Sequence, residues 1–257
     1  MYQDRKVYAV LLAAGSGSRM HAKEKKQFME LCGKPVFVYS LLAFEKSTLV
    51  DEIVLVTAAE DKKKVLEASE SYGIRKLSSV AEGGSERYHS VLHALLKIAE
   101  TNAGKPSADH AYHTGNRQQD PIVLIHDSAR PMLTEKLIRD SVEGAAEYHA
   151  AVVGMPVKDT IKILDRENYV ASTPDRSTLW LMQTPQSFDF SLIYQAYTAM
   201  AAEESKGRLT VRITDDAQVL EHFMHIPVKI IPGSYENIKI TTPEDIKIAG
   251  WYLTGRD

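Results

Sequence analysis

The sequence predicts an α/β fold: a Rossmann-like, mainly parallel and twisted sheet with helices on both faces. Short aliphatic runs such as EIVLVT (residues 52–57) and PIVLI (121–125) alternate with longer segments of helical periodicity, the order expected of βαβ units. The 257 residues are 44% hydrophobic and 25% charged, which supplies a large core. A glycine turn follows the first aliphatic run, at LLAAGSGSRM (11–20). We therefore expect ligands beyond the carboxyl ends of the strands.

Each element follows from its own residue pattern. We predict strands where aliphatic runs are bounded by polar or turn-forming residues, over 6–14, 52–57, 76–80, 121–125, 150–156, 228–231 and 237–240. We predict helices where apolar residues recur every three or four positions, over 35–46, 61–72, 85–99, 134–149, 192–204 and 215–222. A last helix is predicted to begin at TTPED, with Thr242 as its N-cap and Pro243 in its first turn.

Residues 1–257 are predicted to form a single domain with two protruding segments. Residues 101–120 are polar and rich in helix-breaking residues, so we expect a surface insertion there. Residues 158–181 have no helical period, and apolar residues such as Ile161 and Ile163 alternate with polar ones around a turn-rich centre. Such an extended arm makes a poor core element, so we expect it to pack against a second copy of the chain.

Charge, apolar runs and cysteine content narrow the classes of function. The net charge of −3 argues against general nucleic-acid binding. The N-terminal apolar run spans about nine residues, short of the ~20 that cross a bilayer, so we expect no membrane segment and a cytoplasmic protein. The single cysteine, Cys32, excludes an internal disulfide and a cysteine-rich metal site. His89 and His93 are spaced as two metal ligands on a helix, but no third ligand accompanies them.

The glycine turn in LLAAGSGSRM matches neither of the two best-known phosphate-binding fingerprints. The dinucleotide pattern G-x-G-x-x-G fits at Gly15 and Gly17, but Met20 occupies the position of the third glycine. This mismatch weakens the case for a nicotinamide-dependent oxidoreductase. The Gly-Lys-Ser/Thr of the Walker motif is absent. Small residues still let backbone N–H groups approach an anion, and Arg19 and Lys26 add positive charge. We therefore predict a phosphate site of another kind.

Side chains near other strands support an anionic ligand. Asp127 and Arg130, in HDSARP, follow a buried strand, and Asp127 can hold Mg²⁺ or a ligand hydroxyl, or simply cap the next helix. Lys239 lies in a predicted strand near the C-terminus. No nucleophile paired with a base stands out. This suits transfer to a phosphate monoester, because a second pKa of ~6 makes that group an anion at pH 7.

A larger set of motifs is shared with one known family. LAAGSGSRM…KKQFMELCGKPV resembles the nucleotidyltransferases that join a sugar phosphate to a nucleotide. With GGSERYHSV, HDSARP, VKDTIK, DRSTLWLMQTPQSF and NIKITTPEDI, it resembles the 2-C-methyl-D-erythritol 4-phosphate cytidylyltransferase family over about residues 7–253. The resemblance implies transfer of the cytidylyl group of CTP to 2-C-methyl-D-erythritol 4-phosphate, with release of pyrophosphate, in non-mevalonate isoprenoid biosynthesis. The segment 101–120 is longer than the family's usual connection.

The resemblance also implies roles for individual residues. Arg19 and Lys26 would stabilise the transition state at the α-phosphate. The nucleotide would be bound by Ala13, Ala14, Gly15, Ser16, Gly17, Ser18, Gly84, Ser85 and Ser90, and the acceptor by Asp127, Arg130, Thr160, Arg176, Thr184 and Lys239. The family commonly has Asp where this chain has Ser85. Mg²⁺ would be held mainly by the phosphates of CTP, with Asp127 as a weaker ligand.

In this family the arm reaches across a homodimer, so the resemblance places Thr160 and Arg176 in the site of the neighbouring subunit. Two alternatives stay open. A ribitol-5-phosphate cytidylyltransferase would share the fold, the glycine turn and CTP, and would differ in its acceptor pocket. A non-catalytic nucleotide-binding module would share the fold alone, and the presence of Arg19, Lys26 and Asp127 argues against it.

Overall fold

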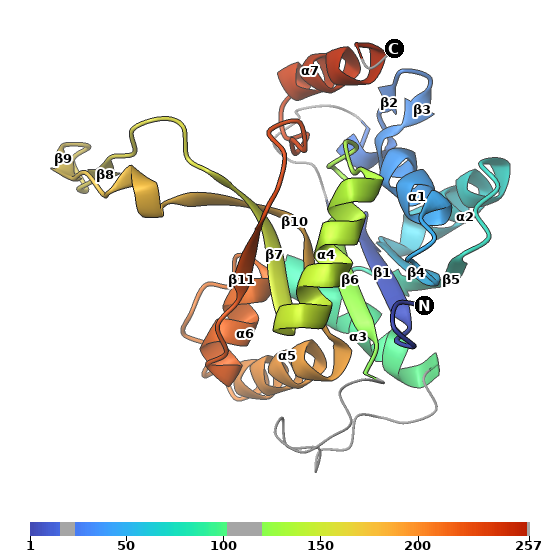
Figure 1. The fold of residues 1–257 in the computed structure, drawn as a ribbon, viewed down its shortest axis with the longest axis horizontal. Helices are drawn as coiled ribbons and strands as arrows, with labels where there is room; N and C mark the ends of the chain where they lie inside the picture. The colour runs from blue at the N-terminus through green and yellow to red at the C-terminus, as the bar shows by residue number, and fades with distance from the viewer. Residues whose placement is uncertain (16–23, 102–119, 256–257) are drawn as a thin grey trace.

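A seven-stranded sheet forms the centre of the structure, a computed structural model that describes residues 1–15, 24–101 and 120–255 (Figure 1). Its order is β11-β7-β10-β6-β1-β4-β5. The strands are β1 (Val7–Leu12), β4 (Glu52–Thr57), β5 (Leu77–Glu82), β6 (Ile122–Asp127), β7 (Ala150–Pro156), β10 (Trp180–Asp189) and β11 (Lys229–Pro232). Every pairing in this sheet is parallel except those of β10, which runs antiparallel to both β6 and β7. The predicted, mainly parallel α/β sheet is confirmed.

Helices cover both faces of the sheet because the central strands are buried on both sides. The helices are α1 (Val36–Lys46), α2 (Lys62–Ser71), α3 (Arg87–Thr101), α4 (Glu135–Tyr148), α5 (Phe190–Ser205), α6 (Asp216–Met224) and α7 (Pro243–Thr254). Along β1, Val7, Ala9 and Leu11 face the core shared with α1 and α4. Tyr8 and Val10 face the opposite core, shared with α3, α5 and α6. This alternation is the period of two expected for a strand between two layers.

The C-terminal helix packs beside a short hairpin rather than on the sheet. The hairpin consists of β2 (Glu30–Leu31) and β3 (Lys34–Pro35), and it follows the one-turn helix η2 (Lys26–Phe28). Leu31 shares a small third core with Ile240 and with Ala249 of α7 (Figure 1). The carboxylate of Asp245 accepts a hydrogen bond of 2.8 Å from the backbone N–H of Thr242, so the predicted start of this helix is confirmed.

An extended segment leaves the body between β7 and β10 (Figure 1). Near its tip, β8 (Ile163–Leu164) pairs antiparallel with β9 (Val170–Ser172), and the one-turn helix η5 (Arg176–Thr178) precedes β10. Four apolar side chains of this segment are at least 50% exposed: Ile163, Leu164, Tyr169 and Val170. The predicted arm, residues 158–181, covers this segment, and its last two residues pair with β7.

One predicted strand is absent from the structure, and one observed strand was not predicted. Residues 237–240 form no strand, because their backbone is bonded elsewhere: the Asn237 carbonyl accepts from Arg130, and the Ile240 N–H donates to the carbonyl of Ala129. Conversely, β10 continues to Asp189 as an interior strand that was not predicted. It contains Pro185, a residue normally kept out of central strands, and the pairing with β7 shifts register there. Residues 102–119, most of the predicted insertion, lie outside the described residues.

Candidate active site

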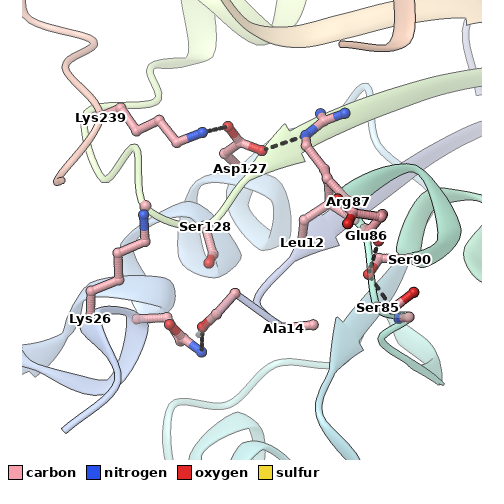
Figure 2. A pocket seen from close by; sticks show the side chains of 14 residues that line it. Leu12, Ala14, Lys26, Ser85, Glu86, Arg87, Ser90, Asp127, Ser128 and Lys239 are labelled. Atoms are coloured by element: carbon pink, nitrogen blue, oxygen red, sulfur yellow. Dashed lines mark hydrogen bonds and ion pairs between the residues drawn. The ribbon is translucent and has the colours of Figure 1, made fainter. Parts of the chain in front are cut away.

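A pocket of about 400 Å³ lies beyond the carboxyl ends of β1, β5 and β6, where a parallel sheet places its ligands (Figure 2). Its lining residues are Leu12, Ala14, Gly15, Lys26, Gln27, Gly84, Ser85, Glu86, Arg87, Ser90, Asp127, Ser128, Ala129 and Lys239. Most of the described residues predicted for the nucleotide therefore meet in one place, together with Lys26, Asp127 and Lys239. Ser16, Gly17, Ser18 and Arg19 lie outside the described residues.

The beginning of the glycine turn is fixed by a glutamine that sequence analysis did not single out. Gln27 is buried, and its Nε2 donates to the carbonyls of Ala13 at 2.8 Å and Gly15 at 3.0 Å. Ala13 is therefore a support behind the pocket wall, while Gly15 lines the pocket. Because Gln27 holds the turn from η2, its neighbour Lys26 is set on the same wall. No residue pattern in the sequence identifies this glutamine as functional. The one signal that could have pointed to it is its position next to Lys26.

One end of the pocket consists of glycine backbone and hydroxyl groups. A Cβ added at Gly83 would lie 2.3 Å from the Cβ of Ala14, and one added at Gly84 would lie 2.2 Å from the Cβ of His89. These distances are too short for any side chain, so only glycine lets this turn approach Ala14 on one side and α3 on the other so closely. The Ser90 hydroxyl accepts a hydrogen bond of 3.0 Å from the N–H of Gly84 and fixes the turn.

The other end of the pocket is charged. Lys239 Nζ lies 2.7 Å from Oδ2 of Asp127, and Arg87 Nε lies 3.3 Å from Oδ1 (Figure 2). Burial favours the neutral form of Asp127, but Arg87, Lys239 and Arg130 outweigh it and hold the pKa of this carboxyl well below its usual range. Both oxygens therefore belong to a fixed anion that accepts hydrogen bonds from cations. A general-base role for Asp127 is not supported by this arrangement.

Arg87 is fixed in turn by a second, fully buried carboxylate. Its Nη1 and Nη2 donate to the two oxygens of Asp216, at 2.7 and 2.8 Å. Burial alone would lower the pKa of Arg87, but the charges of Asp216 and Asp127 raise it well above its ordinary value. Arg87 stands within the GGSERYHSV motif, yet its bond to Asp216 spans 129 positions. Sequence analysis had no local signal for this pair.

Two residues predicted for the acceptor, Thr184 and Arg130, lie behind Asp127 rather than in the pocket lining. The Thr184 hydroxyl accepts a 3.1 Å hydrogen bond from the N–H of Asp127 and contacts Nδ1 of His126 at 3.0 Å. Arg130 Nη1 donates to the carbonyl of Asn237 at 2.6 Å. Burial lowers the pKa of His126 to about 4, so this imidazole is neutral at pH 7. These residues support the position of Asp127.

The remaining predicted acceptor residues lie on the arm. Thr160 is exposed, and Arg176, also exposed, donates from Nη1 to the carbonyl of Lys158 at 2.8 Å. Neither lines the pocket of its own chain. Their predicted part in a neighbouring subunit's site stays a prediction.

Two other sequence-based expectations concern metals and membranes. In the described parts of the chain, no group of three or more His, Cys, Asp or Glu side chains could hold a metal ion. His93 bonds through Nδ1 to the carbonyl of Glu82, and His89 bonds to Glu204. No helix within the described residues has both the length and the apolar character needed to cross a membrane.

Comparison with known proteins decides the family. The family model IspD, 2-C-methyl-D-erythritol 4-phosphate cytidylyltransferase, matches residues 7–255. The chain belongs to this cytidylyltransferase family. A relative from Lachnospira eligens that carries the family's name is 42% identical over 247 residues, 96% of this chain and 99% of its own length. A relative of the same name from Pelotomaculum thermopropionicum is 42% identical over 98% of this chain and 95% of its own.

Solved structures of this cytidylyltransferase family have the same fold. A 4-diphosphocytidyl-2C-methyl-D-erythritol synthase from Anaerococcus prevotii superposes with a TM-score of 0.75 at 30% identity, over 98% of this chain and 97% of its own. A 2-C-methyl-D-erythritol 4-phosphate cytidylyltransferase from Francisella tularensis gives a TM-score of 0.71 at 26% identity, over 96% of this chain and 99% of its own. The sequence-based identification of the chain as a nucleotidyltransferase of non-mevalonate isoprenoid biosynthesis is confirmed.

Proposed function

We propose that the pocket binds CTP with its base at the glycine end and its triphosphate at the lysine end, and that the 4-phosphate of 2-C-methyl-D-erythritol 4-phosphate attacks the α-phosphorus. The observation that carries this proposal is the uneven distribution of positive charge between the two ends of the pocket. Figure 2 shows Lys26 and Lys239 on one side of the pocket and Ser85, Glu86 and Ser90 on the other; Gly84 also lines the pocket. Fixed cations suit a triphosphate, and backbone and hydroxyl groups that form directional hydrogen bonds suit a base.

The reaction we propose is a direct in-line displacement. An oxygen of the acceptor phosphate forms a bond to the α-phosphorus of CTP, and the bond from that phosphorus to the β-phosphate's bridging oxygen breaks, releasing pyrophosphate. The attacking phosphate has a second pKa of ~6 and needs no base at pH 7. Lys26, with Arg19 beyond the described residues, would offset the charge that develops on the α-phosphate. Lys239, held by Asp127, would position the acceptor phosphate.

We propose Mg²⁺ as the metal of this reaction, bound mainly through the nucleotide. Both oxygens of Asp127 are engaged by cations, and no three-carboxylate or histidine cluster occurs in the described parts of the chain. These residues fit an ion that would be held mainly by the triphosphate, with Asp127 as a weaker ligand, and do not fit an all-protein cage. When bound, the ion supplies charge neutralisation to the departing pyrophosphate.

We also propose that the arm completes the site of a second copy in a homodimer. Its exposed apolar residues, among them Ile163 and Tyr169, suit burial against another chain. Thr160 and Arg176 are exposed on the same arm and could then reach the partner's pocket. Because the reaction consumes CTP, we expect the enzyme to work in the cytoplasm.

Pyrophosphate release tests the acceptor. The protein is mixed with CTP and Mg²⁺ together with 2-C-methyl-D-erythritol 4-phosphate or, in parallel, ribitol 5-phosphate. We expect release with the first acceptor and background release with the second. Release only with ribitol 5-phosphate would overturn the acceptor assignment. Release with neither acceptor, with CTP still bound, would support a non-catalytic module instead.

A further inference from the structure

A chain of three side chains leads from the glycine end of the pocket to α5. Ser85 lines the pocket, and its Oγ lies 3.0 Å from Nδ1 of His89, one turn along α3. Nε2 of His89 lies 2.9 Å from Oε2 of Glu204, near the end of α5. The other oxygen, Oε1, accepts a 2.8 Å hydrogen bond from the hydroxyl of Tyr88. The imidazole thus connects a pocket hydroxyl to an anchored carboxylate.

The direction of each hydrogen bond in this chain follows from a backbone group. The N–H of Glu86 lies 3.3 Å from Nδ1 of His89, and a backbone N–H can only donate. Nδ1 therefore carries a lone pair, and the ring proton is on Nε2, where it is donated to Glu204. The hydrogen bonds from His89 and Tyr88 outweigh burial and lower the pKa of Glu204, so this group is an acceptor.

The hydroxyl of Ser85 is left with only one orientation. The one lone pair of His89 Nδ1 is shared between the Ser85 hydroxyl at 3.0 Å and the longer contact from the Glu86 N–H at 3.3 Å. Since Nδ1 has no proton to give, Ser85 donates its proton to it and presents only lone pairs to the pocket. An unconstrained serine would donate or accept as its ligand required. The imidazole lies directly beneath the turn, because a Cβ at Gly84 would be 2.2 Å from the Cβ of His89. His89 therefore lies behind the pocket wall, and Ser85 is the member of the relay that would face the base.

We propose that His89, supported by Glu204, is a specificity-determining residue that fixes Ser85 as a hydrogen-bond acceptor and so selects a base carrying an amino group over one carrying a carbonyl. This inference rests on the proposed function and deepens it. The amino group of cytosine would donate to Ser85 Oγ, whereas the carbonyl of uracil would face a second acceptor. Ser85 is exposed in the unliganded pocket, so the cost arises only when a bound base covers it. An acceptor that is then buried without a donor costs about 1–3 kcal/mol, a preference of roughly 10-fold or more for CTP.

Steady-state kinetics with CTP and UTP test the relay. His89→Phe retains an aromatic ring but removes the acceptor, which frees the Ser85 hydroxyl to donate. We expect the ratio of kcat/KM for CTP to that for UTP to fall about 10-fold in this variant. Ser85→Ala should lower the same ratio, and adding His89→Phe to Ser85→Ala should change it no further. His93→Phe is the matched control, because His93 lies one turn along α3 and bonds to the carbonyl of Glu82.

A structural role for His89 would give a different pattern. It would lower kcat/KM for both nucleotides equally and leave their ratio unchanged, which would overturn the inference. Additive effects of His89→Phe and Ser85→Ala on the ratio would also overturn it, because His89 would then act without Ser85. Equilibrium binding of CTP and UTP without acceptor separates the two proposals. Preferential CTP binding that depends on His89, without turnover, would contradict the proposed reaction but support the relay; equal binding of both nucleotides would contradict the relay.

Discussion

The ammonium of Lys239 lies 2.7 Å from Oδ2 of Asp127, although 112 positions separate the two residues in the chain. Asp127 ends the buried strand β6, whereas Lys239 lies in an irregular segment before α7. That segment is anchored beside the site by the bond from the Ile240 N–H to the carbonyl of Ala129. The anchoring brings a lysine from near the end of the chain to the lining of a pocket built on the first strand.

Asp127→Asn should disturb both cations that Asp127 holds. The acceptor-dependent kcat/KM should fall by ~10²-fold, because Lys239 loses the carboxylate that places it. The free energy of unfolding at pH 7 should fall by about 2 kcal/mol, a typical value for a hydrogen bond to a charged group.

The same variant makes a prediction about pH. The pKa of Asp127 is depressed in the folded state, so its stabilising effect is complete above the unfolded pKa of ~3.9 and is lost as the pH falls below that value. The stability difference between the native protein and Asp127→Asn, from urea unfolding, should therefore shrink between pH 7 and pH 3. A difference that stays constant over this range would contradict the assigned charge of Asp127.

Lys26→Ala should lower kcat by ~10²–10³-fold with little change in melting temperature, because it removes a charge placed at the developing phosphate charge. Lys25→Ala is the matched control, since the Lys25 ammonium is bound to Glu60 and Asp61, both at 2.6 Å. The control should retain most of the activity in the pyrophosphate-release assay. Equal losses in the two variants would indicate that general positive charge matters, rather than the position of Lys26.

Gly83→Ala should weaken CTP binding. Its new Cβ would lie 2.3 Å from the Cβ of Ala14, so β1 and the turn before α3 must separate. We expect the KM for CTP to rise by ~10-fold and the melting temperature to fall by several degrees. Gly250→Ala, in α7, is the control: its new Cβ meets other atoms only at 3.8 Å or more, so that variant should keep its KM. An unchanged KM for Gly83→Ala would show that the close approach is unnecessary.

His126 should make the protein less stable in mild acid. Burial lowers its folded-state pKa to about 4, below the unfolded value of ~6.5, so the unfolded state binds more protons between these values. The free energy of unfolding should consequently fall as the pH drops from 7 to 5, by about 2 kcal/mol from this residue. His126→Asn should lose that part of the pH dependence in urea titrations. A native-like slope in the variant would assign the effect to other groups.

Elements that are determined by a local pattern of apolar residues could be predicted from the sequence. The aliphatic run of β6 and the amphipathic period of α3 identify their elements regardless of what they contact. The interior strand β10 carries Pro185 together with buried Gln186 and Ser187, a composition typical of an edge or a loop. It lies inside the sheet because β6 and β7 both pair with it, and no local sequence pattern indicates such pairing.

The residues of the candidate site also fall into those that local sequence motifs predict and those that they do not. Lys26, Asp127 and Lys239 could be predicted because each stands in a motif shared with the family, and the structure gathers them in one pocket. Asp216 and Glu204 could not, since each acts through a partner more than a hundred positions away. A buried carboxylate that holds an arginine or a histidine is defined by three-dimensional proximity alone.

The pocket draws its walls from residue 12 to residue 239, and this has a consequence for biosynthesis. A nascent chain can complete β1 and its glycine turn early, but it cannot hold nucleotide firmly until the segment carrying Lys239 has been translated and docked. Nucleotide should accordingly protect the two ends of the chain together against proteolysis, rather than shield the first half alone. Ligand affinity would then report how completely the molecule has been assembled.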